Sequence, residues 1–368
     1  MVDEAWLTAA YELLRIPSTA DRPTELARAL DWMIERADPG AGFTVERFES
    51  RGKPSALLYR GDVRPGRFRM ILNGHLDVVP APDELFTPRR VGDRLHARGA
   101  QDMKLSALVM ADVFRELAPR VPYPLGLQLV TDEELGGRDG TGHQVEAGVT
   151  TDFAVIGEMS RLDITVESKG LIDVTLTAEG RAAHGAYPWL GDNALLTVVC
   201  AVQAILDHYP VPAEEAWRTT VNVAKIDTSN AAFNQVPASA SAWLNLRFPP
   251  TDPDFTGRTV AEVTRHLARI AGPGVTVGVA HVDAPHQAER DHPDVTALRR
   301  AAQAQGYGGA FLRRHGAGDG RFYFQAGMAA VAFGIGGEGQ HGPDEYADLT
   351  TIPAYRDALR DFLLSTRL

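Results

Sequence analysis

The chain has 368 residues, of which 44% are hydrophobic and 23% are charged. This length allows a large core and two domains, and the composition is that of a folded globular protein, which excludes a disordered or low-complexity chain. The net charge of −11 argues against nucleic acid and anionic membrane as partners and favours a small molecule.

The first part of the chain alternates helical and extended patterns. Apolar residues recur at three- and four-residue spacing over 3–16, 23–38 and 104–117, which predicts helices. Strands are expected over 43–50, 55–61, 67–75, 125–131 and 152–158. Because the later strands are almost continuously apolar and alternate with helices, we predict an α/β fold with a mostly parallel sheet flanked by helices.

The middle of the chain has a different order of elements. Residues 171–283 read as strand, helix, strand, strand, helix, strand, which is a split βαβ arrangement able to bury its own core. Residues 284–368 return to the first pattern, with helices over 293–305 and 352–366. We therefore predict a catalytic domain formed by 1–170 and 284–368, with an inserted α+β domain at 171–283.

The single cysteine, Cys200, excludes an intramolecular disulfide and fits a reducing compartment. It lies in the apolar run LLTVVCAVQAIL, where we expect it to pack in the core. That run, of about a dozen residues, is too short to span a bilayer. The acidic, amphipathic start of the chain is unlike a signal peptide, so a cytoplasmic location is expected.

Several loops that follow predicted strands carry residue types that bind metals. They are His75 with Asp77, Asp102, Glu133 with Glu134, Glu158 and His341. Residues two apart on an extended segment face the same way, so the Asp77 carboxylate could orient the His75 imidazole. Taken alone, each residue has an ordinary explanation: a structural histidine, a helix cap or an exposed acidic turn.

Together these residues indicate a shared site. Functional side chains of doubly wound sheets gather at the carboxyl ends of the strands. Two imidazoles and several carboxylates at that edge suit two close divalent ions bridged by a carboxylate and a water. Neighbouring carboxylates repel one another without a cation, and a metal that binds one glutamate can leave its neighbour as a base.

The segments GHLDVVP, ARGAQDMK, TDEELGG, GEMS and HGPDEY resemble, in order and spacing, a family of co-catalytic zinc metallopeptidases and amidohydrolases. This family includes acetylornithine deacetylase, succinyl-diaminopimelate desuccinylase, aminoacylase and carboxypeptidase G. The resemblance extends over nearly the whole chain. It implies a zinc-peptidase-like catalytic domain, a ferredoxin-like inserted domain that serves as lid and dimerisation domain, and a homodimer.

The resemblance also implies a role for each residue of the shared site. One zinc would be bound by His75, Asp102 and Glu158, and the other by Asp102, Glu134 and His341. Glu133 would be the general base, and Asp77 would orient His75. Cobalt and manganese are the alternative metals.

In the inserted domain, the resemblance implies that His184 reaches the active site of the partner subunit and helps to hold the developing oxyanion. Asn234 and Arg247 would contact the substrate carboxylate, for which the planar guanidinium is well shaped. The chain departs from many relatives at Leu105 and Ser106, which replace a pair of glycines, and at Gly318 before Asp319. The departures affect pocket shape and leave the metal ligands intact.

The implied reaction is removal of an N-acyl group from an amino acid, by a water that bridges the metals with Glu133 as base. A dipeptidase or carboxypeptidase of the same family is the alternative. Two hypotheses come from other classes: a catalytically silent scaffold, which a missing ligand would favour, and a two-metal phosphoesterase, which would need more positive groups. The sequence leaves open which acyl group and which amino acid are recognised.

Overall fold

The computed structural model describes residues 2–38 and 40–367. The chain forms two compact units. The first unit contains the chain up to Val166, then Gln287–Arg313, then the chain from Gly318 onwards; the second contains Glu167–His286 with Arg314–Ala317.

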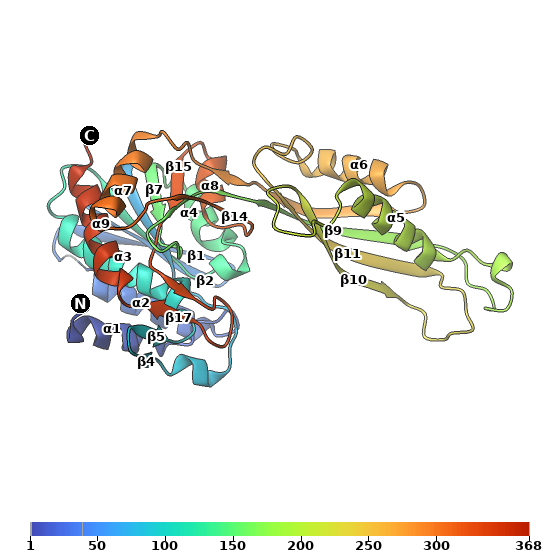
Figure 1. Ribbon diagram of the computed structural model, residues 1–368, viewed down its shortest axis with the longest axis horizontal. Helices are drawn as coiled ribbons and strands as arrows, with labels where there is room; N and C mark the ends of the chain where they lie inside the picture. Colours follow the sequence, from blue (N-terminus) through green and yellow to red (C-terminus); the bar gives the residue numbers. More distant parts are fainter. Residues whose placement is uncertain (1, 39, 368) are drawn as a thin grey trace. The chain divides into compact units, whose positions relative to one another are not determined.

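The first unit is built on a mixed sheet whose centre is parallel (Figure 1). Its strands follow the order β1-β2-β6-β3-β7-β15-β8-β13, and β14 also pairs with β8. The parallel centre consists of β6 (Leu125–Val130), β3 (Phe68–His75), β7 (Thr151–Ile156) and β15 (Ala329–Ala332). The outer strands are β1 (Phe43–Ser50), β2 (Lys53–Arg60), β8 (Ile164–Ser168), β13 (His286–Gln287) and β14 (Phe311–Arg314).

Helices cover both faces of this sheet because alternate strand residues point to opposite sides. Met70 and Leu72 of β3 belong to one core, whereas Ile71 packs with Tyr323 in the other. The first core is closed by α1 (Glu4–Leu14), α2 (Pro23–Ala37), α3 (Leu105–Leu117), α7 (Pro293–Ala304) and α9 (Thr351–Ser365). The second is closed by α4 (His143–Glu146) and α8 (Gly320–Gln325).

A smaller sheet and several short helical turns complete the first unit. The small sheet has the order β16-β17-β5-β4, formed by Gly337–Glu338, Tyr346–Asp348, Arg94–His96 and Arg89–Val91. The turns are η1 (Asp83–Phe86), η2 (Ala100–Lys104), η3 (Glu133–Leu135) and η4 (Arg138–Gly142). Strands of two or three residues have no detectable period, so the sequence did not predict them.

The second unit has its own sheet and core. Its elements are β9 (Gly170–Glu179), the turn η5 (Pro188–Leu190), α5 (Ala194–His208), β10 (Thr220–Thr228), β11 (Ser239–Phe248), α6 (Val260–Ala271) and β12 (Thr276–Asp283). The antiparallel sheet has the order β10-β11-β9-β12, which is ferredoxin-like. Figure 1 shows α5 and α6 side by side over it. The predicted fold class, a mostly parallel sheet with helices and an inserted α+β unit, is confirmed.

One packing prediction is wrong: Cys200 is exposed. Helix α5 has apolar residues on both sides, and Val198, Val202 and Ile205 occupy the side that faces the core. Cys200 therefore falls on the outer side, where Leu196 and Val199 are also exposed. Within the described part of the chain, no helix combines the length and apolar character needed to cross a membrane.

Candidate metal centre

The parallel strands of the first unit bring the predicted site residues to one edge of the sheet. His75 is the last residue of β3, and Glu158 lies two residues beyond the end of β7. Glu133 and Glu134 form the turn η3 after β6. Because these strands run parallel, their carboxyl ends meet, which is where ligands bind in such sheets.

Two further residues reach the same place from connecting segments. Asp102 lies in η2, directly before α3, and the peptide bond that follows it is cis. His341 lies in the loop between β16 and β17 and has a left-handed backbone conformation, with φ of 61°. All five predicted ligands therefore come from separate segments of one unit.

Their side chains form two groups that share Asp102. In the first group, His75 Nε2 lies 3.0 Å from Asp102 Oδ1 and 3.3 Å from Glu158 Oε1. In the second, His341 Nε2 lies 3.2 Å from Asp102 Oδ2 and 3.2 Å from Glu134 Oε2. Asp102 thus turns one oxygen toward each group, as a bridging carboxylate would.

The spacing within each group fits a small divalent cation. Ligands of a tetrahedral zinc, each about 2.0 Å from the ion, are about 3.3 Å apart. The separations between each histidine and its two carboxylate oxygens, 3.0 to 3.3 Å, match this value, and all ligand atoms of a group lie within 4.8 Å of one another. The structure therefore brings together two groups of residues, each of which could hold a metal ion.

The electrostatics of the site also fit cations. Burial and then the charge of Asp102 raise the pKa of Glu134 to about 7. Burial and then the charge of Glu158 raise the pKa of Glu133 well above its usual value. Burial disfavours the charged form of Asp102 too, but hydrogen bonds from His341 and His75 outweigh it and lower its pKa. A cation between these carboxylates would relieve the repulsion that burial intensifies.

His75 is oriented by a backbone group. Its Nδ1 donates to the carbonyl oxygen of Asp77 at 3.0 Å, so Nε2 is the nitrogen that faces Asp102 and Glu158. The Asp77 carboxylate, which we expected to orient His75, also faces Nδ1, with Oδ1 at 3.5 Å, and its other oxygen accepts a hydrogen bond from the backbone nitrogen of Glu134 at 3.0 Å. Because Nε2 faces carboxylate oxygens, it needs a proton or a metal there.

A buried ion pair that the sequence did not predict connects the two loops that carry Asp102 and His341. Arg98 donates to Glu345 at 2.5 Å and to the carbonyl oxygen of His341 at 2.9 Å. The other Glu345 oxygen accepts from the backbone nitrogens of Gln101, at 3.1 Å, and Asp102, at 3.3 Å. Only 4% of Arg98 and 2% of Glu345 are exposed, so this pair holds both loops from inside the protein.

One more unpredicted contact reaches the shared carboxylate. Gln340 donates to Asp102 Oδ2 at 2.6 Å. The only sequence cue for these partners is their position: Gln340 precedes His341, Glu345 follows it by four residues, and Arg98 precedes Asp102 by four. Such spacings are common in loops, so they could not have identified the contacts.

The remaining predicted residues lie in the second unit. His184 is exposed and forms an isolated antiparallel bridge with Gln235, and the backbone nitrogen of Gly185 donates to the carbonyl oxygen of Asn234 at 2.6 Å. His184 and Asn234 therefore lie on neighbouring loops, near the start of β11. Arg247 lies near the other end of this strand, with Nε donating to Asn245 at 2.9 Å. Arg247 is eight positions after Ser239 along the strand, or about 27 Å.

Known proteins resemble this chain over most of its length. The family model for Peptidase family M20/M25/M40 matches residues 71–365. A succinyl-diaminopimelate desuccinylase of Granulibacter bethesdensis is 30% identical and covers 97% of this chain and 98% of the relative. A probable carboxypeptidase of Paracoccidioides lutzii is 34% identical over 61% of this chain and 54% of its own length.

Two solved structures have the same fold. An aminopeptidase of Bacillus cereus has a TM-score of 0.78 and 16% identity, covering 98% of both chains. A metallo-carboxypeptidase of Sulfolobus solfataricus has a TM-score of 0.76 and 17% identity, covering 98% of this chain and 99% of its own. At these identities the likeness concerns the fold alone.

Fold, ligand groups and relatives together define a metal-dependent hydrolase that acts on amide or peptide bonds. The chain belongs to Peptidase family M20/M25/M40. The resemblance seen in the five sequence motifs and the predicted enzyme class are thereby confirmed.

Proposed function

We propose that the chain is a two-metal hydrolase that removes an N-acyl group from an amino acid. The observation that carries this proposal is the pair of ligand groups that share Asp102, with Glu133 beside them. The near-full-length relatives named succinyl-diaminopimelate desuccinylase favour an acyl amino acid as substrate. A dipeptidase or carboxypeptidase is the alternative, favoured by the relative named as a probable carboxypeptidase.

His75, Asp102 and Glu158 would hold one ion, and Asp102, Glu134 and His341 the other. The mixed nitrogen and oxygen ligands favour zinc, with cobalt or manganese as alternatives. When bound, divalent ions in such a site lower the pKa of a water molecule and polarise the carbonyl group of the substrate.

Glu133 would move the proton. Its carboxylate is next to the metal ligands without being one of them, and a carboxylate placed there can accept a proton and return it. It would accept a proton from the attacking water as the oxygen bonds to the carbonyl carbon. It would then donate that proton to the amine nitrogen as the carbon–nitrogen bond breaks.

A second copy of the chain would complete the site. His184 and Asn234 lie near the start of β11, whereas Arg247 lies near its end. Within one chain, these residues are therefore too far apart to contact the same small substrate. We propose that the partner subunit supplies His184, for the oxyanion, and Asn234, whereas Arg247 binds the substrate carboxylate. The exposed apolar side chains of α5 and the edge strand β10 would form the dimer surface.

Leu196→Glu is expected to convert the dimer into monomers. The Leu196 side chain is 61% exposed on the outer side of α5, and a charge there would be buried without a partner in the interface. Sedimentation velocity should show the change, and turnover should fall with it. Val211→Glu, at a site 66% exposed outside this helix face, is the control and should stay dimeric. A dimeric Leu196→Glu protein would reject the proposed surface.

Glu345→Gln is expected to weaken metal binding about 10- to 100-fold, the usual effect of losing an outer partner of a metal ligand. The amide cannot accept hydrogen bonds from both Arg98 and the backbone nitrogens before Asp102, and it leaves the buried Arg98 charge uncompensated. Competition with a zinc-binding dye measures the affinity. Exposed Glu84→Gln is the control. Unchanged affinity in a folded Glu345→Gln protein would show that the ion pair does not position the ligands.

We also propose a cytoplasmic enzyme, on the basis of the single, exposed Cys200 and the expected small-molecule substrate. Partners other than a second copy and the substrate are not expected; in particular, the acidic chain gives no basis for nucleic acid or anionic membrane as partners.

The function is tested by assaying the zinc-loaded protein on N-succinyl and N-acetyl amino acids, dipeptides and one phosphodiester. A kcat/KM that is higher for the acyl amino acids than for the other substrates would support the proposal. A higher kcat/KM for the dipeptides would favour the alternative. Chelation should abolish activity, and zinc, cobalt or manganese should restore it. Activity on the phosphodiester alone, or none on any substrate, would reject both amide-bond functions.

A further inference from the structure

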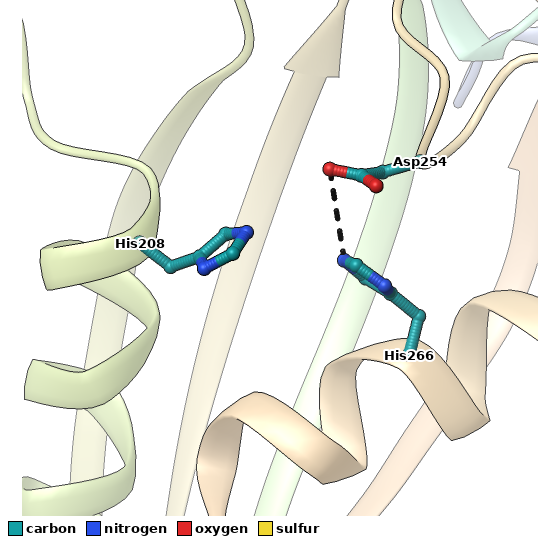
Figure 2. Close-up of side chains that lie close together, drawn as sticks. All are labelled: His208, Asp254 and His266. Atoms are coloured by element: carbon teal, nitrogen blue, oxygen red, sulfur yellow. Dashed lines mark ion pairs between the residues drawn. The ribbon is translucent and has the colours of Figure 1, made fainter.

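We propose that the second unit carries a metal-binding site of its own, formed by His208, Asp254 and His266. His208 is the last residue of α5, Asp254 lies in the loop between β11 and α6, and His266 lies within α6. Figure 2 shows the three side chains pointing into a shared space. They belong to a different unit from the ligand groups around Asp102.

The distances suit a first-row transition metal. Each residue offers one ligand atom, and these atoms all lie within 4.8 Å of one another. Asp254 Oδ2 and His266 Nε2 are 3.9 Å apart. Because tetrahedral zinc ligands lie about 3.3 Å apart, the group must contract by roughly 0.6 to 1.5 Å. His208 is exposed at a helix end, so rotation of its side chain can supply this movement.

The donor set also selects the kind of ion. Two imidazoles and one carboxylate, with water as a fourth ligand, are typical of zinc, and imidazoles also suit copper and nickel. Magnesium and calcium prefer oxygen ligands, so they should bind weakly or not at all. The cluster is open to water, because His208 is exposed and the other two residues are only half-buried.

Tyr209 holds two of the three side chains close together. Its hydroxyl donates to Asp254 Oδ2 at 3.0 Å and contacts His266 Nε2 at 2.7 Å, although the tyrosine itself is buried. This hydroxyl therefore turns the carboxylate and the imidazole toward a common point. Because the hydroxyl lies against the Nε2 atom that a metal would bind, it must move away from His266 when a metal binds. In that state it would keep its bond to Asp254 and act as the outer partner that orients a metal ligand.

Arg269 defines the competing metal-free state. Its guanidinium lies 3.2 Å from His266 Nδ1, and because arginine only donates, Nδ1 accepts and Nε2 carries the proton. Metal binding at Nε2 requires that proton to move to Nδ1, so Arg269 must withdraw. Arg269 is exposed and can do so. Removing it should therefore strengthen metal binding, the opposite of removing a ligand.

The test counts zinc on the full-length protein by equilibrium dialysis at buffered free zinc, followed by elemental analysis. Wild type should bind one zinc more than His208→Gln or Asp254→Asn, whose affinity for this ion should fall at least about tenfold. Arg269→Ala should bind it roughly fivefold more tightly, and exposed Gln203→Ala on the same helix should behave as wild type.

This difference does not depend on how many ions the first unit holds, so the outcome is separate from that of the proposed function. A zinc-dependent slowing of hydrogen exchange at the end of α5, in wild type but not in His208→Gln, would locate the ion. Equal zinc content in wild type, His208→Gln and Asp254→Asn would overturn the proposal. Affinity lowered by Arg269→Ala would contradict the binding mode.

Discussion

Glu133→Gln should leave the bound metal ions in place and remove most of the turnover. The glutamine amide has the shape of the carboxylate but cannot accept a proton from water or return one to the leaving amine. Loss of general acid–base catalysis lowers kcat by about 10²- to 10⁴-fold. Glu133 lies outside both ligand groups, so the substitution removes proton transfer without removing a ligand.

The measurement pairs kcat with metal content in the same sample. Glu35→Gln, an exposed change in the same unit, is the matched control and should keep full activity. A Glu133→Gln protein with wild-type metal content and wild-type kcat would exclude Glu133 as the base. Loss of metal together with activity would instead make Glu133 a ligand or a support for one.

The sequence predicted the parts of the catalytic unit whose pattern is long or whose chemistry is distinctive. Strands such as β6, a continuous apolar run that is buried throughout, and helices such as α2, with regularly spaced apolar residues, are long enough to be recognised. The five proposed ligands could be selected because each follows or precedes a predictable element and because their motifs resemble one family. Their convergence follows from the parallel sheet, since parallel strands end at the same edge.

What the sequence could not predict depends on contacts between distant segments. The Arg98–Glu345 pair joins residues 247 positions apart, and neither residue is unusual in its own loop. Cys200 was misplaced because a helix that is apolar on both sides does not show which side faces the core. His75 Nδ1 also bonds to a backbone carbonyl, and because every residue has such a group, the sequence could not predict this bond.

The inserted unit gives another example of a distance that the sequence did not reveal. Asn234 and Arg247 are close in sequence and were expected to bind one substrate together, but an extended strand separates neighbours by about 3.4 Å for every residue. The intervening β11 therefore places them at opposite ends of the sheet. Asn234 and Arg247 could contact the same small substrate only if a second chain supplied one of them. The proposed substrate site therefore depends on the proposed dimer.

Asp102→Asn should have the second large effect, because Asp102 is the one side chain common to both ligand groups. An asparagine has a single acceptor oxygen, and its NH₂ group cannot bind a cation. Only one of the two groups can then keep its third protein ligand. We expect the first unit to hold at most one tightly bound zinc and kcat to fall by about a thousandfold or more, since the paired ions supply most of the activation of water.

Zinc content is best counted in a His208→Gln background, so that only ions of the first unit contribute. Glu158→Gln is the informative comparison, because Glu158 belongs to the first group alone, and its loss should weaken one ion while sparing the other. If Asp102→Asn retained two zinc ions with wild-type affinity, Asp102 would not bridge them. If it and Glu158→Gln lost the same single ion, Asp102 would serve one group only, and its second oxygen, which accepts from His341 and Gln340, would have a purely structural role.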